Sequence, residues 1–453
     1  MHTAIFDIGK TNKKFSIFDE HLNEIYREVE TLPLIEDEDG YPTEDLTLLT
    51  DWMKGVLRKA MKSKKFDISR LNFSTYGASM VHLDSSGRLA TPLYNYTKPF
   101  PEALLEKFYA ENGGRDAFCA RTASPSLGML NSGLQLYWLK HMRPEAFARI
   151  KYSLHLPQYC AYVFSRQLLC EYTSIGCHTG LWDYANHTYH PWVAKQGIEA
   201  LFPASVPATS KTKMIVYYQI LDVGTGIHDS SAALIPYLLS SKEPFLLLST
   251  GTWSITFNPF NQELLTAEEL NKDCLNFMRT DGSPVKASRL FFGNEFNIQT
   301  KLMAEHFGRT EHNYHHIITF DEALYEKWSK IDQPLFHLQS VQYPDNSIRS
   351  ASETRWELFP TFEDAFHRFM IEMMQLQSKA IKLAAGSMPI NKLFLDGGFS
   401  QSDVFISLLR KEFPSTDIII SPSPLGSSLG AAMAINDPQV GENYQYNMKR
   451  VAL

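Results

Sequence analysis

The sequence predicts an α/β protein built from two related domains. Apolar strand-like runs alternate with segments whose apolar residues have helical spacing, which is the pattern of an α/β fold. A strand–turn–strand stretch near the N-terminus has a counterpart with the same layout near the middle of the chain. The length of 453 residues also exceeds what one small hydrophobic core organises.

The first of these stretches, AIFDIGKTNKKFSIFD, covers residues 4–19. Residues 4–8 form the first expected strand, and Phe15 to Phe18 form its hairpin partner. Asp7 stands at the end of the first strand, and a lysine-rich turn that begins with Gly9 follows it. A carboxylate placed directly before so tight a turn is the first candidate functional residue.

A helix and two further strands are expected next. Residues 46–57 place apolar side chains near helical spacing, and residues 71–84 (LNFSTYGASMVHLD) indicate a strand, a glycine-containing bend and a second strand. Residues 98–222 are rich in aromatic residues, prolines and short helix-like segments. The pattern does not fix the order of elements in that region.

The second strand–turn–strand stretch, FLLLSTGTWSITFNPF, covers residues 245–260. It repeats the layout of the first stretch, though not its residues, and each stretch begins about half of the chain. We therefore place the domain boundary within residues 236–244. This gives an N-terminal domain of residues 1–240 and a C-terminal domain of residues 241–453.

Two glycine-containing segments follow in the second half. KLFLDGGFSQSDVFISLL, residues 392–409, predicts a strand, the pair Gly397 and Gly398, and a helix opened by a capping pair, Ser400 and Asp403. A strand, a double glycine and a helix N-terminus bring backbone amides where a nucleotide can approach closely. SPSPLGSSLGAAMAI, residues 421–435, predicts a loop that leads into a tightly packed helix.

Composition narrows the class of protein. The formal net charge of −7 provides no general attraction for nucleic acid or for an anionic membrane. The five cysteines form no C-x-x-C pair, which favours reduced thiols over a disulfide framework or a zinc site. The charged N-terminal segment lacks the apolar run of a signal peptide, and no apolar run is long enough to span a bilayer. We expect a cytoplasmic protein without nucleic-acid or membrane partners; a homodimer and a monomer both stay open.

These stretches together resemble those of the FGGY carbohydrate kinases, from Asp7 to about Ala434. That family belongs to the superfamily of sugar kinases, actin and heat-shock chaperone ATPases. The segments GIHDSSAAL and STGTWS are most similar to the rhamnulokinase branch. The resemblance implies two actin-like (ribonuclease H-like) α/β domains around a central cleft, with ATP mainly against the C-terminal domain and the sugar mainly against the N-terminal one.

The resemblance implies that one turn of each domain holds the phosphates of ATP. Asp7 would hold Mg²⁺, partly through water, because Mg²⁺ keeps part of its hydration shell. The phosphate contacts implied in the first turn are Gly9, Thr11 and either Lys13 or Lys14; those in the second turn are Gly251 and Thr252. An ordinary hairpin with a solvated polar turn is the alternative in each case. No P-loop motif is present.

Phosphoryl transfer to a sugar also needs a group that accepts the hydroxyl proton. The resemblance assigns this role to Asp229 and a substrate hydrogen bond to His228. Asp229 stands where a helix opens, so we expect the helix dipole to keep its carboxylate ionised at neutral pH. The alternatives are a plain helix N-cap for Asp229 and a structural role for His228.

The remaining contacts are implied by position in the resembling family. Gly397 and Gly398 are the first candidates for the adenosine site, followed by Asn294 and Gln299 in the segment RLFFGNEFNIQTKL; Asn294 could equally cap a helix. Tyr76 and Gly77 are the candidates for the sugar site.

The sequence thus predicts an ATP- and Mg²⁺-dependent sugar kinase. The acceptor would be a small ketose such as L-rhamnulose, L-fuculose or xylulose. Two alternatives stay open: a polyol kinase, and a nucleotide-binding sensor of the same superfamily that has lost phosphoryl transfer.

Overall fold

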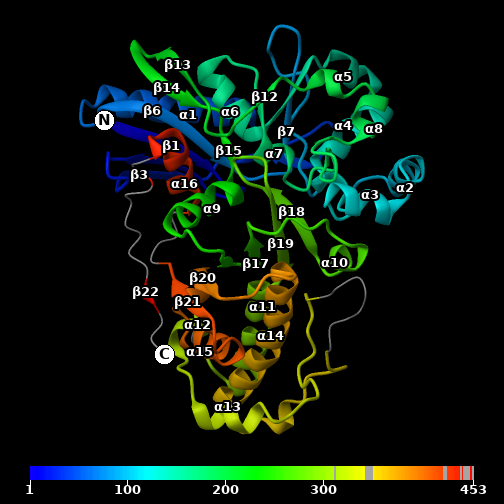
Figure 1. Cartoon of the computed structure of the whole chain (residues 1–453), viewed down its shortest axis with the longest axis vertical. Helices are drawn as coiled ribbons and strands as arrows, with labels where there is room; N and C mark the ends of the chain where they lie inside the picture. The colour runs from blue at the N-terminus through cyan, green and yellow to red at the C-terminus, as the bar shows by residue number, and fades with distance from the viewer. Residues whose placement is uncertain (311–312, 342–349, 422–425, 439–440, 442–448, 451–453) are drawn as a thin grey trace.

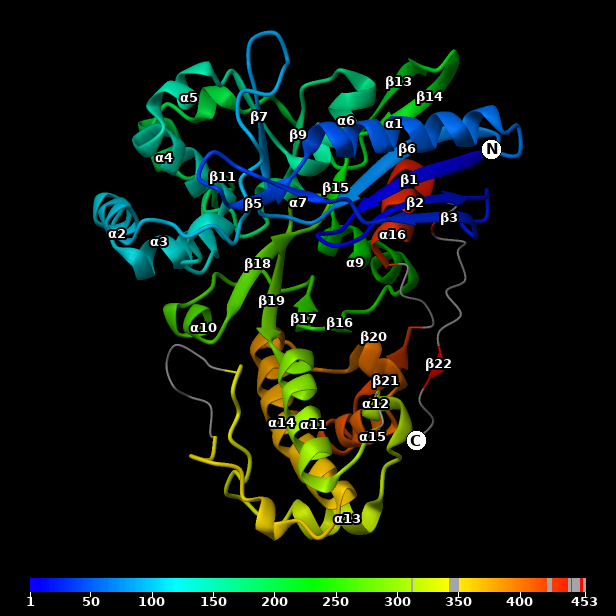
Figure 2. The ribbon, with the colours of Figure 1, turned by 180° about the vertical axis from the view of Figure 1, so that it is seen from behind.

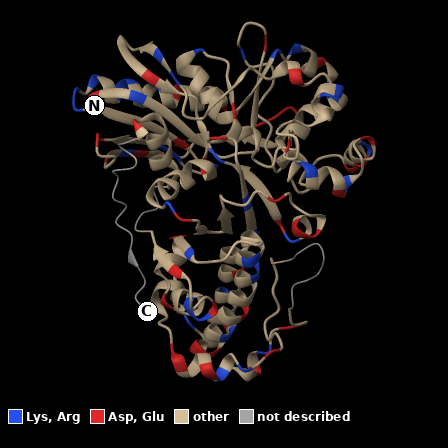
Figure 3. Ribbon diagram, in the orientation of Figure 1, with Lys and Arg blue, Asp and Glu red and all other residues tan. Residues whose placement is uncertain are grey.

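The computed structural model describes residues 1–310, 313–341, 350–421, 426–438, 441 and 449–450. Figure 1 shows two lobes stacked along the long axis of the molecule, the upper built mainly from the N-terminal half and the lower from most of the residues that follow it. Each lobe contains a seven-stranded sheet. Figure 3 shows acidic and basic residues interspersed along both lobes.

The first sheet contains the predicted N-terminal hairpin. The hairpin strands are antiparallel and pair Asp7 with Lys14, while the first strand also pairs in parallel with β6, where Asp7 lies opposite Ser74. The strand order is β13 (Lys211–Val216), β14 (Gln219–Gly224), β6 (Ile68–Thr75), β1 (His2–Ile8), β2 (Lys13–Phe18) and β3 (Glu24–Glu30), with β15 (Ile227–His228) also paired to β6. The prediction of a strand hairpin at residues 4–18 is confirmed.

Helices cover both faces of this sheet because side chains alternate along β1. Ala4, Phe6 and Ile8 face a core shared with α1 (Leu46–Lys62) and α6 (Leu156–Ser165). Ile5 points the other way, into a core made with α9 (Asp229–Ser240) and α16 (Gly426–Ile435). The predicted helix at residues 46–57 is therefore correct and extends one turn further.

Helix α16 comes from the C-terminal end of the chain but packs on the N-terminal sheet. Figures 1 and 2 both show it beside β1, and the side chain of Asn72 on β6 donates to the carbonyl of Ala431. A Cβ at Gly430 would overlap the carbonyl oxygen of Ala232, so α16 and α9 touch backbone to backbone there. This confirms a tightly packed helix; residues 422–425 of the predicted loop before it lie outside the described part of the chain.

The region between β6 and β13 forms a separate layer beside the first sheet. Its core is aromatic and includes Tyr94, Phe108, Tyr137 and Trp192. The predicted second strand after β6 is present as β7, which pairs with β8 rather than with the main sheet. Besides α6, the elements of this region are β7 (Met80–Leu83), α2 (Glu102–Glu111), α3 (Arg115–Thr122), η1 (Gly128–Leu130), α4 (Ser132–Met142), α5 (Pro144–Arg149), β8 (Tyr152–His155), β9 (Cys170–Glu171), α7 (Tyr172–Ile175), β10 (Trp182–Asp183), β11 (Thr188–Tyr189), α8 (Pro191–Lys195), η2 (Glu199–Leu201) and β12 (Ser205–Val206). The short strands β4 (Leu34–Glu36) and β5 (Pro42–Glu44) precede β6 and pair with each other.

The second sheet contains the second predicted hairpin. Its strand order is β18 (Cys274–Met278), β19 (Pro284–Leu290), β17 (Ser254–Asn258), β16 (Leu246–Thr250), β20 (Lys392–Gly397), β21 (Asp417–Ile420) and β22 (Lys449–Arg450). The two hairpin strands, β16 and β17, are antiparallel, and β20 pairs in parallel with β16. The helical elements of this lobe are α10 (Ala267–Asn271), α11 (Phe292–Phe307), α12 (Tyr314–Ile317), α13 (Glu322–Trp328), η3 (Trp356–Leu358), α14 (Phe362–Ala385), η4 (Gly398–Gln401) and α15 (Asp403–Glu412).

The predicted capping pair of α15 is wrong. The N-cap is Ser402, whose hydroxyl accepts from the backbone of Phe405. Ser400 lies in the preceding 3-10 turn η4 and donates to the carbonyl of Gly397 instead. The extra 3-10 turn shifts the helix start, because Ser400 is used to close the glycine turn.

Helix α9 lies between the two sheets. Ala232 and Ile235 pack into the core of the first lobe, while Leu234 and Tyr237 pack against the second sheet beside Phe394. The expected boundary at residues 236–244 therefore includes the last turn of a helix that both lobes bury. No described helix has the length and apolarity that crossing a membrane requires.

Candidate active site

Asp7 lies at the carboxyl end of β1, beneath the first turn of α16. Its Oδ2 accepts hydrogen bonds from the hydroxyls of Ser427 and Ser428, both at 3.0 Å. Lys14, opposite it on β2, approaches the same oxygen at 3.3 Å. A buried strand end, a helix N-terminus and a lysine thus stabilise this carboxylate and fix its orientation.

The turn between β1 and β2 separates the two lysines that the sequence left as alternatives. Lys13 is buried, and its ammonium donates to the carbonyls of Gly9 and Lys10 and to Glu44, at 3.0, 3.0 and 2.9 Å. It stabilises the turn from inside. Lys14 leaves 38% of its side chain exposed, so Lys14 is the better placed of the two to meet an anion from outside.

Asp229 opens α9, two strands away from Asp7 in the same sheet. Strand β6 pairs with both neighbours, so Asp7 faces Ser74 while His228 faces Thr75. Adjacent strands lie about 4.8 Å apart, which places the two segments roughly 10 Å apart across the sheet. Asp7 and Asp229, more than 200 residues apart in the sequence, are thus brought to the same end of the first sheet.

Asp229 differs electrostatically from the expectation. Desolvation raises its pKa to about 7, and the negative charge of Asp7 adds to that rise; the amide and hydroxyl of Ser230 and the charge of Lys14 oppose it. The side chain is nevertheless 34% exposed. The expected fully ionised carboxylate is therefore wrong for the free protein at neutral pH, because loss of hydration outweighs the helix dipole. Asp229 is also not the N-cap of α9, a position that His228 occupies.

His228 is buried beside this carboxylate. Its Nε2 lies 3.3 Å from Asp229 Oδ1 and 3.1 Å from the sulfur of Cys177, and its ring stacks on Phe277. Burial lowers the pKa of His228 to about 3, so the ring is neutral. Its buried Nδ1 has no hydrogen-bond partner among the described residues. Nε2 thus faces both the Asp229 carboxylate and the Cys177 sulfur.

Gly77 and Tyr76 lie against this group. A Cβ at Gly77 would come within 2.7 Å of the Cys177 sulfur and 2.8 Å of His228 Nε2, so the glycine makes room for the histidine. The hydroxyl of Tyr76 donates to Glu44 at 2.5 Å and is buried. The ring of Tyr76, rather than its hydroxyl, is what this residue can offer to a ligand.

The turn between β16 and β17 is the exposed counterpart in the second lobe. The amide of Gly251 donates to the carbonyl of Trp253 at 2.9 Å, and both Gly251 and Thr252 are exposed. The backbone amide of Asn294 donates to the carbonyl of Thr252 at 3.2 Å. Asn294 is thus in the first turn of α11, whose N-cap is Phe291, and the capping alternative for Asn294 is wrong.

Gly397 joins this turn to the end of β20. Its φ is 89°, and a Cβ there would overlap the carbonyl oxygen of Thr250, so only glycine fits. Around Gly398 there is open space. The carboxylate of Asp396 accepts from the hydroxyl of Tyr237 at 3.0 Å. Helix α9 therefore begins at Asp229 and, about 12 Å further along its axis, contacts the strand that carries the double glycine.

Two models of protein families match this chain. The model of the N-terminal domain of the FGGY family of carbohydrate kinases matches residues 2–229. The model of the C-terminal domain of carbohydrate kinase FGGY matches residues 242–443. The chain belongs to the FGGY family of carbohydrate kinases. Its two matched parts meet at α9, where the lobes meet.

Individual relatives of this FGGY protein are distant. A rhamnulokinase from Mannheimia succiniciproducens is 23% identical over 224 residues, which cover 48% of this chain and 44% of that relative's length. A carbohydrate kinase from Novosphingobium aromaticivorans is 24% identical with a TM-score of 0.81, over 99% of this chain and 93% of that one. A xylulose kinase from Rhodospirillum rubrum is 15% identical with a TM-score of 0.80, over 100% and 93%. These structures confirm the predicted fold of two actin-like α/β domains.

One predicted residue of the FGGY protein lies apart from the turns. Gln299 is fully buried in α11, and its side-chain amide donates to Glu295 and to the carbonyl of His337, both at 2.7 Å. It supports the segment at residues 337–340 from below. A nucleotide contact by Gln299 would need that segment to move, and it stays a prediction.

The fold brings three further side chains to the site that were not among the predicted contacts: Lys10, Glu44 and Tyr96. Glu44 joins Lys13 and Tyr76, as described above. The ring of Tyr96 lies under the ammonium of Lys10; burial, Glu44 and Asp229 together raise the pKa of Tyr96. Glu44 and Tyr96 follow no motif in the sequence, so only the tertiary fold could reveal them.

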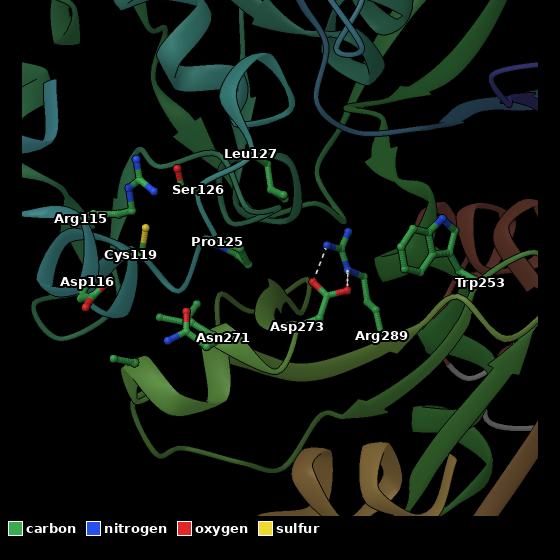
Figure 4. Close-up of a pocket in the computed structure, with 12 residues that line it drawn as sticks. Arg115, Asp116, Cys119, Pro125, Ser126, Leu127, Trp253, Asn271, Asp273 and Arg289 are labelled. Carbon is green, nitrogen blue, oxygen red and sulfur yellow. Dashed lines mark hydrogen bonds and ion pairs between the residues drawn. The ribbon is translucent and has the colours of Figure 1, made fainter. Parts of the chain in front are cut away.

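A pocket of about 370 Å³ adjoins the second turn (Figure 4). It opens between α3 and the 125–127 segment on one side and α10, Asp273 and Arg289 on the other. Arg289 makes a bidentate ion pair with Asp273, and its guanidinium lies over the ring of Trp253. Trp253, the residue after Thr252, thus forms one end of a pocket that extends between the lobes.

Proposed function

We propose that this chain is an ATP-dependent carbohydrate kinase that transfers the γ-phosphoryl group of ATP to a hydroxyl of a small sugar. The acceptor we favour is a ketose such as L-rhamnulose, L-fuculose or xylulose. One observation carries the proposal: Asp7 and Asp229 stand at one edge of one sheet, close enough for the charge of Asp7 to raise the pKa of Asp229. A sugar kinase needs one carboxylate for the metal and one for the acceptor proton.

In this proposal Asp229 accepts the proton of the acceptor hydroxyl. The oxygen of that hydroxyl forms a bond to the γ-phosphorus, the bond from that phosphorus to the β–γ bridging oxygen breaks, and ADP leaves. A base with a pKa near 7 suits this exchange, since it takes up the proton during transfer and releases it afterwards. His228, neutral and with Nε2 3.3 Å from the carboxylate, packs beside Asp229 and restricts its orientation.

The phosphate chain would lie between the two turns. The exposed amide of Thr252 and the exposed Thr11 supply donors, Gly251 lets the phosphates approach the turn closely, and Lys14 supplies charge. Without a P-loop lysine, such a site depends on backbone amides and a metal. Gly397 and the open space at Gly398 are proposed to receive the adenosine.

The residues present fit a magnesium ion held jointly with the phosphates. Mg²⁺ takes one or two protein carboxylates and completes its shell with water and phosphate oxygens. Asp7 provides such a carboxylate, and in the described part of the chain its side-chain hydrogen bonds all fall on Oδ2. Among the described residues no cluster of three or more His, Cys, Asp or Glu side chains is present, so the ion would bind together with the nucleotide. When bound, it neutralises phosphate charge.

A cytoplasmic location stays part of the proposal, since all five cysteines are buried free thiols.

The test is sugar-dependent release of ADP from Mg·ATP across a panel of ketoses, polyols and sugar acids. We expect turnover with one chemical class, and Asp229→Asn to lower kcat by about 10²-fold or more while ATP still binds. Turnover with polyols only would make the chain a polyol kinase. ATP binding without turnover on any acceptor would contradict the kinase and support the sensor. Near-normal turnover of Asp229→Asn would remove Asp229 from its role.

A further inference from the structure

The ammonium of Lys10 occupies an unusual place in the first turn. Its Nζ lies 5.2 Å from the ring centre of Tyr76 and 5.0 Å from that of Tyr96. The side chain is 29% exposed, and burial lowers the pKa of Lys10. Two aromatic faces hold the cation by cation–π attraction, at the cost of part of its hydration.

Lys10 has no hydrogen-bond acceptor within the described part of the chain. The nearest carboxylate oxygen, Glu44 Oε1, is 3.9 Å away. That carboxylate is already used, because Lys13 donates to Oε1 at 2.9 Å and Tyr76 donates to Oε2 at 2.5 Å. Three N–H donors on a partly dehydrated cation are therefore free for an anion from outside, and such charge-assisted bonds are strong.

The position of this cation selects the anion. Lys10 follows Gly9, the turn glycine proposed to face the phosphates. Tyr96, whose ring lies under Lys10, is close enough to Asp229 for that carboxylate to raise the pKa of its hydroxyl. The ammonium thus belongs to the phosphate turn and lies on a tyrosine ring that the charge of the proposed base also reaches. A neutral sugar would bring no charge to this ammonium, whereas the transferred phosphoryl group would.

The two other lysines of the turn cannot replace it. The ammonium of Lys13 already donates to two carbonyls of the turn and to Glu44. Lys14 stands opposite Asp7 in the hairpin and forms an ion pair with it. Lys10 is the lysine of this turn whose donors are unused in the described structure.

We propose that Lys10 is a further catalytic residue, whose ammonium hydrogen-bonds the γ-phosphoryl group of ATP as it passes to the acceptor. The inference rests on the proposed kinase function and deepens it. Lys10 keeps its proton throughout: the acceptor proton goes to Asp229, the bond to ADP breaks and the bond to the sugar oxygen forms. The ammonium stabilises the charge on the phosphoryl oxygens during that exchange.

The test compares nucleotides with and without the γ-phosphate. Lys10→Met keeps the aliphatic length over the two tyrosine rings and removes the charge; Lys65→Met, at an exposed position remote from the site, is the control. With Mg²⁺ present, calorimetry should show about tenfold weaker binding of the non-hydrolysable β,γ-imido analogue of ATP by Lys10→Met, with ADP binding within about twofold of the wild type. We expect kcat to fall about 10²-fold with the sugar KM within about threefold, and Lys10→Arg to restore part of the preference for the ATP analogue.

Equal weakening of both nucleotides, or no change in either, would overturn the inference. A rise in sugar KM without a change in nucleotide preference would also overturn it, and would assign Lys10 to the acceptor. The kinase proposal fails separately, if wild-type protein binds ATP but releases no ADP with any acceptor; the comparison of ATP analogue with ADP still tests Lys10 in that case. Wild-type protein that binds neither nucleotide overturns both.

Discussion

At the scale of single residues, Asp229, the proposed base, is held in the fold at a cost in stability. Its pKa in the folded protein is about 7, against an ordinary value near 4 in an unfolded chain. Between these values the folded state binds a proton that the unfolded state does not. Stability contributed by the protonated group is therefore present at low pH and is lost as pH rises from about 4 to about 7.

Asp229→Asn should consequently stabilise the ligand-free protein, and more so at high pH. After discounting for its partial exposure we expect about 1–2 kcal/mol at pH 8, shrinking toward pH 4 to 5. Thermal unfolding of both proteins at pH 5 and pH 8 measures this. A difference in Tm that is the same at both pH values would contradict the raised pKa.

Gly77 carries a second residue-scale prediction. Gly77→Ala would push a methyl group against Cys177 and His228, so we expect about 1–3 kcal/mol of destabilisation and a fall in kcat as His228 leaves Asp229. The control is Gly55→Ala on the exposed side of α1, where a Cβ meets nothing within 4 Å; it should be neutral or slightly stabilising. Wild-type Tm and kcat in Gly77→Ala would show that His228 tolerates displacement.

At the scale of elements, the contact between α9 and α16 determines where both carboxylates lie. α9 begins with Asp229, and the first turn of α16 hydrogen-bonds Asp7. The two helices touch at Gly430 and Ala232, with no room for a side chain between them. Two residues 222 positions apart in the sequence are thereby aligned by one helix pair.

Gly430→Ala should separate this pair. We expect a loss of about 2 kcal/mol or more, since backbone would have to move, together with weaker Mg·ATP binding because Ser427 and Ser428 leave Asp7. Gly55→Ala again provides the control for a helical glycine without a neighbour. Thermal unfolding and nucleotide titration measure the two effects, and stability equal to that of the wild type would mean that the helices can part without loss.

At the scale of the whole molecule, α9 is buried by both lobes and links their sites. The bond from Tyr237 to Asp396 ties it to the strand that carries Gly397. Burial raises the pKa of Asp396, and the tyrosine hydroxyl opposes that rise. This hydrogen bond thus couples a strand of the second lobe to the helix that carries the proposed base.

Tyr237→Phe should weaken this link while keeping the packing of the ring. We expect a loss of about 1 kcal/mol, which is about 1 °C in Tm for a chain of 453 residues, and ADP affinity reduced a few-fold. Tyr218→Phe removes a fully exposed hydroxyl from the β13–β14 turn and should change neither. If both variants behave alike, the hydrogen bond does not couple the lobes.

The sequence by itself determined the local parts of this protein. Pairs of apolar runs joined by a glycine-containing turn predicted both hairpins, helical spacing predicted α1, and the small residues of 426–435 predicted a closely packed helix. These patterns depend only on near neighbours in the chain. The order of the motifs then indicated the FGGY family and the fold of two actin-like domains.

Only the tertiary structure decided which side chains face one another and how they ionise. It turned Lys13 inward and left Lys10 over Tyr76 and Tyr96, placed α16 on the opposite lobe from its sequence neighbours, and buried Gln299. It also raised the pKa of Asp229 where the helix dipole alone predicted the reverse. Desolvation and long-range packing depend on residues hundreds of positions away, and no local pattern records them.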